Sequence, residues 1–155
     1  MHERAAAFKQ QAEESFDIEV DVHEFPAGTK TAEDAAAVVG CDLAQIASAL
    51  VFVADQVVVV VTSGANNVDT RKLATHRGVN QARMADPDDV SETLGWSIGG
   101  VPPFCHDTDV PVFLDESLTD YNTVWAAAGT PEAVFPIHPE AIVEHADAEV
   151  VEIAE

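Results

Sequence analysis

Two neighbouring apolar segments constrain the fold of this chain most strongly. SALVFVA (residues 48–54) and QVVVVVTS (residues 56–63) are rich in β-branched residues and are separated only by Asp55. Short apolar runs of this kind are typical of buried strands, and the tight link between them predicts an antiparallel hairpin at the centre of a sheet. Neither run approaches the roughly 20 apolar residues that a membrane-spanning helix needs.

Short helices and strands alternate along the rest of the 155 residues, which suffice for one domain with its own core. Periodicity and capping residues predict helices over residues 2–15, 31–40, 42–47, 69–78, 86–95 and 139–145. Strands are expected over residues 18–22, 110–114, 123–127, 133–137 and 149–153. We therefore expect a single α/β (α+β) domain, residues 1–155, with a curved, mostly antiparallel mixed sheet surrounded by short helices.

The charge is extreme. Asp and Glu number 28 and Lys and Arg number 7, so the formal net charge is −21. At low ionic strength such a surface repels itself, whereas in molar salt the Debye length falls to about 3 Å and the repulsion is screened. The acidic residues are spread along the chain, which indicates a protein of a high-salt, halophilic cytoplasm; an ordinary acidic protein is the alternative.

The few basic residues are unevenly placed. All seven lie within the first 83 residues, and four of them fall between Arg71 and Arg83. Chance in a small sample explains such clustering. The alternative is a retained contact for a polyanion on an otherwise acidic protein.

The cysteines and the N-terminus favour a cytoplasmic protein without a cofactor. Cys41 and Cys105 form neither a disulfide framework nor a metal motif, and Cys105 beside His106 fits no closed zinc site. The charged N-terminus lacks the apolar core of a signal peptide. The sequence has no P-loop and no GxGxxG after a strand, so no nucleotide cofactor is expected.

Several segments, taken in order, carry a resemblance to a known family. They are TAEDAAAVVG, DLAQIASALVF, VTSGANNVDTRKLA, SIGGVPPFCH and the long run from VPVFLDESLTDYNTVWAAAG to the C-terminus. The series, from about Phe25 onward, resembles the YbaK/EbsC/ProX family, free-standing relatives of the editing domain of bacterial prolyl-tRNA synthetase. The resemblance implies hydrolysis of the ester that joins a wrong amino acid to the terminal ribose of tRNA. It also implies the acceptor end of aminoacyl-tRNA as partner, with an aminoacyl-tRNA synthetase as a possible second partner, and neither a membrane nor DNA.

The resemblance places a catalytic loop at residues 99–103. Gly99, Gly100 and Pro103 match the family's GxxxP loop, whose backbone amides hold the carbonyl region of the substrate. Glycine permits close approach of the backbone, proline stiffens the loop, and fixed N–H donors stabilise an oxyanion with little reorganisation. A plain surface loop is the alternative.

Five further residues match substrate-binding positions of the family. Phe25 and Thr29 match the lining of the small side-chain pocket, and Thr31 matches the pocket's mouth, although it also suits a helix cap. Lys72 is expected either to lie near the acceptor end or to form a structural ion pair. His106 follows the loop, at a position where many relatives also have histidine.

Ser48 is the largest departure from the family. Relatives typically read QIVKSLVF where this chain reads QIASALVF, so the lysine that helps to position the terminal ribose or phosphate falls on Ser48. Serine is short and neutral and cannot replace a long cation. The enzyme could still act through backbone donors, a bound water and the ribose hydroxyl, or its specificity could have moved. As a third alternative, the chain is a non-catalytic relic that binds aminoacyl-tRNA or a small molecule.

Overall fold

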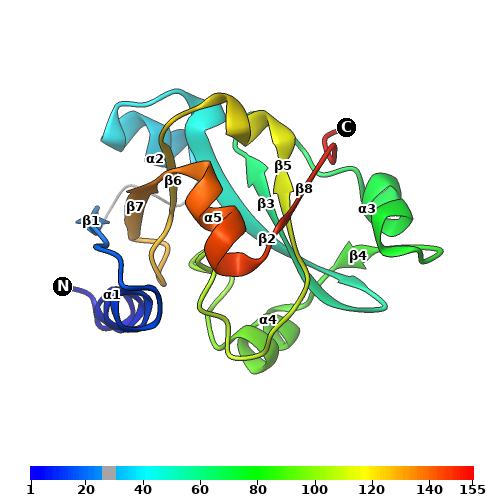
Figure 1. Cartoon of the computed structure of the whole chain (residues 1–155), viewed down its shortest axis with the longest axis horizontal. Coiled ribbons are helices and arrows are strands. Elements are labelled where there is room, and N and C mark those ends of the chain that lie inside the picture. The colour runs from blue at the N-terminus through cyan, green and yellow to red at the C-terminus, as the bar shows by residue number, and fades with distance from the viewer. Residues whose placement is uncertain (26–30) are drawn as a thin grey trace.

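The computed structural model describes residues 1–25 and 31–155 (Figure 1). The helices in this part of the chain are α1 (Glu3–Phe16), α2 (Ala32–Val39), α3 (Thr70–Arg77), α4 (Pro87–Leu94), α5 (Pro139–Ala146) and the 3-10 helices η1 (Leu43–Gln45) and η2 (Glu116–Asp120). The strands are β1 (His23–Glu24), β2 (Ile46–Ala54), β3 (Gln56–Ser63), β4 (Arg83–Met84), β5 (Val112–Asp115), β6 (Val124–Ala127), β7 (Ala133–Ile137) and β8 (Glu149–Val151). Among the described helices, none is long and apolar enough to cross a membrane.

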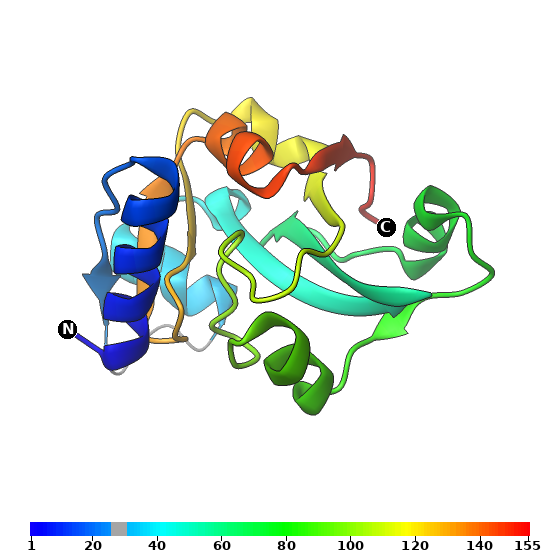
Figure 2. The ribbon, with the colours of Figure 1, turned by 60° about the horizontal axis from the view of Figure 1, so that its bottom comes forward.

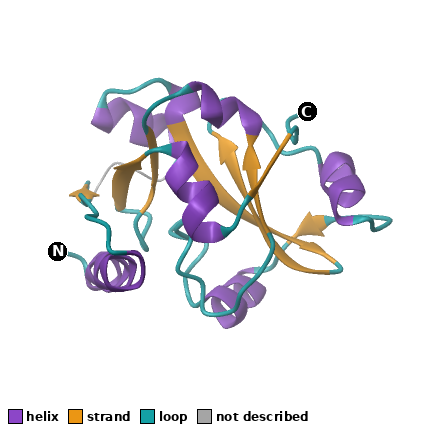
Figure 3. Ribbon diagram, in the orientation of Figure 1, coloured by secondary structure: helices purple, strands orange, loops and turns teal. Residues whose placement is uncertain are grey.

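The strands form one mixed sheet in the order β1-β7-β6-β2-β3-β5-β8, with β4 paired to β2 as well. The pairs β1–β7, β2–β3, β2–β4 and β6–β7 are antiparallel, whereas β2–β6, β3–β5 and β5–β8 are parallel. The β2–β3 hairpin is long and curved (Figure 2). Short helices surround the sheet (Figure 3), so the single-domain mixed fold expected from the sequence is confirmed.

The central hairpin agrees with the sequence pattern. Its register runs from Ala47 opposite Ser63 to Ala54 opposite Gln56, and Asp55 makes the turn with a φ of 73°. Alternate residues of the two strands face different clusters of buried side chains, since Val51 and Phe52 belong to two separate clusters. Burial on both faces explains why the two strands are apolar throughout.

Capping residues place the helices where the sequence predicts them. The Thr31 hydroxyl accepts a hydrogen bond from the backbone N–H of Asp34, and Asp69 accepts from those of Arg71 and Lys72. Each side chain satisfies N–H groups that have no partner within their own helix. Helix α4 begins with Pro87 and ends at Leu94, with Gly95 as its C-cap, close to the expected bounds.

Two predicted elements were wrong. No strand forms over residues 18–22, because the backbone of Val20 bonds to side chains of α1 and not to another strand. The Val20 carbonyl accepts a hydrogen bond from Lys9 Nζ, and the Val20 N–H donates one to the Glu13 carboxylate. The strand in this region is the two-residue β1. The helix expected over residues 42–47 shortens to η1, because Ile46 and Ala47 extend β2 and pair with β6.

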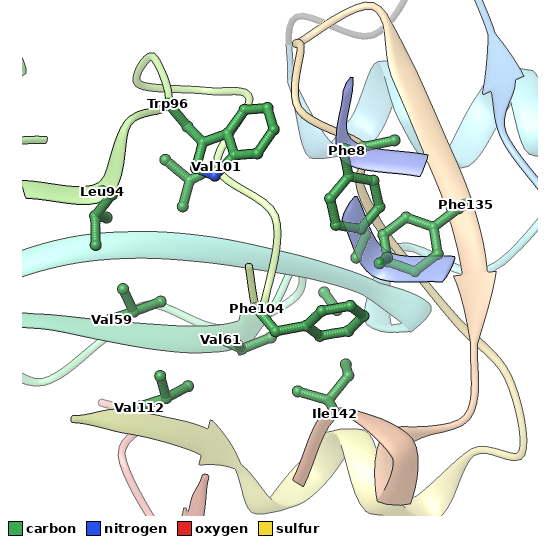
Figure 4. Packing of buried hydrophobic residues seen from close by; sticks show 14 of the residues in the cluster. Phe8, Val59, Val61, Leu94, Trp96, Val101, Phe104, Val112, Phe135 and Ile142 are labelled. Atoms are coloured by element: carbon green, nitrogen blue, oxygen red, sulfur yellow. The ribbon is translucent and has the colours of Figure 1, made fainter. Parts of the chain in front are cut away.

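The main core joins α1 to the sheet and to the segment after α4. Phe8 of α1 is fully buried, with ring centroids 5.0 Å from Phe135 and 5.7 Å from Phe104 (Figure 4). A second cluster, which includes Phe52, Leu73 and Phe113, lies between α3 and the other face of the hairpin. These two cores fix the strands and the residue 97–106 segment that border the candidate site.

Candidate functional site

One edge of the central strand β2 is open along part of its length. On this edge β2 pairs with β6 at Ile46 and Ala47, and with β4 at Phe52 and Val53. Between these two pairings, residues 48–51 have no strand partner on that side, although all of them pair with β3 on the other. The sheet therefore has a gap at its centre, bordered by β6 and β4.

The backbone of Ala49 points its polar groups into this gap. The N–H and C=O of a strand residue point to the same side, and that side alternates from one residue to the next. The Val51 carbonyl accepts from the Ala85 N–H, on the β4 side, whereas the Ile46 carbonyl accepts from Gly64, on the β3 side. Ala49, two residues before Val51, thus presents one N–H donor and one C=O acceptor to the gap.

A cavity of about 280 Å³ occupies the same place. Its described walls come from α2, β2, β4, the residue 98–101 loop, β6 and the segment around β7: Thr31, Ala32, Ala35, Ile46, Ala47, Ser48, Ala49, Leu50, Val51, Met84, Ile98, Gly99, Val101, Trp125, Ala127, Pro131, Ala133 and Val134. Thr31 and Ser48 contribute the hydroxyl groups, and none of these lining side chains is charged. The described part of the lining therefore offers backbone dipoles and hydroxyl groups for chemistry in the cavity.

The loop at residues 99–103 meets the cavity through Gly99 and Val101. Gly99 lines the cavity and has a φ of 87°, a conformation that glycine adopts at little cost. The amide of Gly100 donates to the Ser97 carbonyl at 3.0 Å, and a Cβ atom at Gly100 would lie 2.7 Å from Thr130 Cα. Gly100 is thus a tight packing position whose N–H is already used, while Gly99 borders the cavity.

Pro103 is the last residue of the loop. It is buried and is not part of the cavity lining, which is consistent with a stiffening role. Behind the same loop, His106 Nε2 lies 2.8 Å from the Pro102 carbonyl and therefore donates to it. Burial lowers the pKa of His106, so the ring is neutral at neutral pH. His106 lines a second cavity of about 230 Å³ together with Cys105. Its hydrogen bond to Pro102 therefore supports the loop from the side of this second cavity.

Ser48 stands in the cavity wall, half-buried. Thr62 is its partner on β3, and residues directly opposite each other in a sheet face the same side. Among the hydrogen bonds between described residues, none involves the Ser48 hydroxyl. This hydroxyl is therefore available to a ligand.

Thr31 has both roles considered for it, since its hydroxyl caps α2 and its side chain borders the cavity. Phe25 lies next to the cavity wall: its N–H donates to the Glu132 carbonyl at 2.7 Å and so continues the pairing of β1 with β7. Thr29 lies outside the described residues.

Lys72 is held at a different end of the molecule. Its Nζ is 2.7 Å from Glu152 and 2.6 Å from the Ala154 carbonyl, and hydrogen bonding to Glu152 raises its pKa. The structure thus supports the structural ion pair that the sequence left open, and it does not bring Lys72 to the cavity. Neither Lys72 nor His106 lies among the cavity-lining residues.

Asp115 organises the sheet next to the site. It is buried, and its carboxylate accepts hydrogen bonds from Thr62, Asn66 and Ser117 and from the Ser63 amide. Burial alone raises the pKa of this carboxyl, but the donors outweigh burial and lower it. A fully bonded carboxylate of this kind is a structural anchor for β3, the following turn and η2.

Two alternative chemistries find no support in the geometry. Burial raises the pKa of Cys105 to about 11, so this thiol is protonated at neutral pH and is a poor nucleophile. Among the described residues, no three His, Cys, Asp or Glu side chains are grouped so that they could hold a metal ion.

The sequence pattern did not reveal the open edge of β2 or several cavity walls. Met84, Ile98 and Trp125 line the cavity, and Met84 and Ile98 are 55% and 51% exposed. These residues meet only through long-range pairings such as β2 with β6. In the sequence, the available signal was the large apolar residue Ile98 directly before the Gly-Gly-Val-Pro-Pro loop.

The comparison with protein families agrees with this geometry. The family described as the aminoacyl-tRNA editing domain matches residues 26–144, and the chain belongs to that family. The resemblance to the YbaK/EbsC/ProX proteins is thereby confirmed.

Individual relatives are similar over most of their length. The chain is 38% identical over 128 residues to YwhH, an uncharacterized protein of Bacillus subtilis (strain 168), covering 81% of each chain. It is 29% identical over 125 residues to EbsC of Enterococcus faecalis (strain ATCC 700802 / V583), named as a proposed Cys-tRNA(Pro)/Cys-tRNA(Cys) deacylase, covering 79% of this chain and 76% of that protein. A crystal structure described as a proposed trans-editing enzyme for prolyl-tRNA synthetase matches with a TM-score of 0.94 and 37% identity, over 100% of this chain and 99% of that chain.

Proposed function

We propose that this protein hydrolyses the ester of mischarged aminoacyl-tRNA in trans, with the aminoacyl group bound at the open edge of β2. The observation that carries the proposal is the cavity between Ala49, Gly99 and Ser48 in a chain of the editing-domain family. We further propose that the reaction takes place in the cytoplasm and, as the name of the structural relative suggests, alongside an aminoacyl-tRNA synthetase. We propose neither a membrane nor DNA as a partner.

The polar groups of the cavity suit an aminoacyl ester. In the proposed complex the Ala49 carbonyl accepts from the α-ammonium group, and the Ala49 amide donates to the ester carbonyl beside the Gly99 backbone. In the proposed step, water adds to this carbonyl, the bond to the ribose oxygen breaks, and that oxygen takes up a proton. Backbone donors stabilise the oxyanion that forms, and one such donor is worth about 3–4 kcal/mol in known hydrolases. The ribose hydroxyl of the substrate assists the attacking water, because the described lining holds no charged side chain.

The lining indicates a small amino acid. Six alanines (32, 35, 47, 49, 127 and 133) border a volume of about 280 Å³, which must hold the aminoacyl group and part of the ribose. Alanine, serine, cysteine and proline are the matching candidates. Cysteine is the amino acid in the proposed name of EbsC.

Gly99 provides the test. Gly99→Ala places a side chain at a φ of 87° beside the cavity, and Gly78→Ala introduces the same backbone strain at a φ of 69° in the cap of α3. We expect Gly99→Ala to lower kcat/KM for deacylation at least tenfold, whereas Gly78→Ala retains the wild-type value at a temperature where both are folded. Equal activity of the two variants would contradict a role of the loop backbone in catalysis.

The non-catalytic alternative makes a different prediction. A relic that only binds would hold small aminoacyl-tRNAs without accelerating the release of the amino acid. Parallel measurements of binding and of release by the wild-type protein distinguish the two functions.

A further inference from the structure

Three of the six Lys and Arg residues in the described part of the chain are already engaged. Lys9 pairs with Glu13 at 2.8 Å and Lys72 with Glu152 at 2.7 Å, while the guanidinium of Arg4 lies 4.3 Å from the Trp96 ring centroid. The other three described cations are Arg71, Arg77 and Arg83, and none of them has a carboxylate partner within the described residues. The Nε of Arg77 is buried without a hydrogen-bond partner.

These three arginines lie in a segment without acidic residues. Residues 70–85 contain no Asp or Glu, although 28 of the 155 residues of the chain are acidic. Three carboxylates from outside the segment act on Lys72, those of Glu152, Asp69 and Glu116, and Glu152 is paired with it at 2.7 Å. On a protein with a net charge of −21, this absence of acid leaves a local basic surface, which we call the arginine end (Arg71, Arg77 and Arg83).

One residue of the arginine end, Arg83, is next to the candidate site in sequence. Arg83 precedes Met84 in β4, and Met84 lines the cavity. Figures 1 and 2 both place α3 and β4 at the same end of the molecule, away from the N-terminus. Arg71 and Arg77 lie in the first and last turns of α3, about 9 Å apart along the helix axis at about 1.5 Å per residue. The three arginines therefore lie at one end of the molecule, on the two elements α3 and β4.

We propose that the arginine end binds the phosphodiester backbone of the tRNA acceptor stem, so that the 3′ end enters the cavity past β4. This inference rests on the proposed function. Guanidinium groups suit phosphate because their planar fork donates two hydrogen bonds to it. Such short contacts persist in concentrated salt better than long-range attraction, which is screened within a few ångströms.

The acidic remainder of the surface selects the orientation. From Met84 to the C-terminus there is no Lys or Arg, so surface formed by this part of the chain repels an RNA backbone. The arginine end thus determines both where the stem lies and which way its end points.

The test uses exposed arginines and a matched cation elsewhere. Arg71→Ala/Arg83→Ala is the test variant, and Lys9→Ala removes a cation of α1 that is already paired. We expect the double variant to raise the Kd for uncharged tRNA at least tenfold and to reduce the slope of log Kd against log salt by about one per arginine. Lys9→Ala should change neither quantity. Arg71→Lys/Arg83→Lys should restore the salt slope and only part of the affinity.

Deacylation kinetics provide a second readout. The double variant should raise KM for a full-length aminoacyl-tRNA and leave kcat/KM for an aminoacyl ester of adenosine unchanged, because the short substrate lacks the stem. An unchanged Kd in the double variant, an equal effect of Lys9→Ala, or wild-type protein that does not bind tRNA would overturn the proposal. If the wild type binds tRNA through these arginines but releases no amino acid, the proposed function is wrong, whereas the proposed role of the arginine end in binding tRNA is supported.

Discussion

Introducing a cation at position 48 tests how the cavity holds its substrate. Ser48 is half-buried in the cavity wall, and Thr62 is its partner across the hairpin. A lysine at this position starts from the cavity wall and is long enough to reach a phosphate or ribose oxygen of a substrate bound there. We therefore expect Ser48→Lys to increase the deacylation of small aminoacyl-tRNAs.

The magnitude follows from the surroundings. A hydrogen bond from a charged donor is worth about 1.5–3 kcal/mol, and about 1.4 kcal/mol in the transition state is tenfold in rate. The described lining offers no carboxylate that would compete with the substrate for the new ammonium group. We predict a ten- to hundredfold gain in kcat/KM at low salt, with a smaller gain at molar KCl because an exposed charge is screened there.

The assay is steady-state release of labelled amino acid from aminoacyl-tRNA by wild type, Ser48→Lys and Ser48→Ala. Alanine removes the hydroxyl without adding a charge, so it separates the two effects. If Ser48→Ala and Ser48→Lys both leave the rate of release unchanged, position 48 lies outside the catalytic site and the reasoning is wrong. If alanine alone abolishes activity, the hydroxyl itself holds water or a ribose hydroxyl.

Two further predictions concern stability. The thermal unfolding midpoint, followed by circular dichroism, should rise steeply between low and molar KCl because of the net charge of −21, and an unchanged midpoint would contradict salt adaptation. Asp115 has a lowered pKa in the folded state, so its contribution to stability is complete above the unfolded-state pKa of about 3.9 and is lost as the pH falls through the folded value. Asp115→Asn should therefore lower the free energy of unfolding at pH 7 and flatten its decline in acid; a parallel acid profile for both proteins would refute the assignment.

Local signals in the sequence predicted most elements of the fold. The hairpin around Asp55 and the caps at Thr31 and Asp69 depend on neighbouring residues, and each forms as expected. The strand expected at residues 18–22 failed because a tertiary contact decided it: Lys9 and Glu13 of α1 bind the backbone of Val20. Alternation of apolar and acidic residues cannot reveal such a contact.

The candidate site was predictable only in part. The resemblance pointed to Gly99, Thr31 and Ser48, which the structure brings to one cavity, and to Lys72 and His106, which it places elsewhere. The open edge of β2 arises from strands that are distant in sequence, so no local pattern indicates it. The hydrogen bond from the Gly100 N–H to the Ser97 carbonyl likewise forms only in the folded loop, so the sequence does not indicate it.

The most direct test of the central claim is a deacylation panel with the wild-type protein in molar KCl. Separate tRNAs charged with alanine, serine, cysteine and proline are incubated with and without protein, and the released amino acid is measured over time. The proposed function predicts protein-dependent release from at least one of these tRNAs, and loss of that release in Gly99→Ala. Release at the spontaneous rate from all four, in the presence of demonstrated tRNA binding, would contradict it.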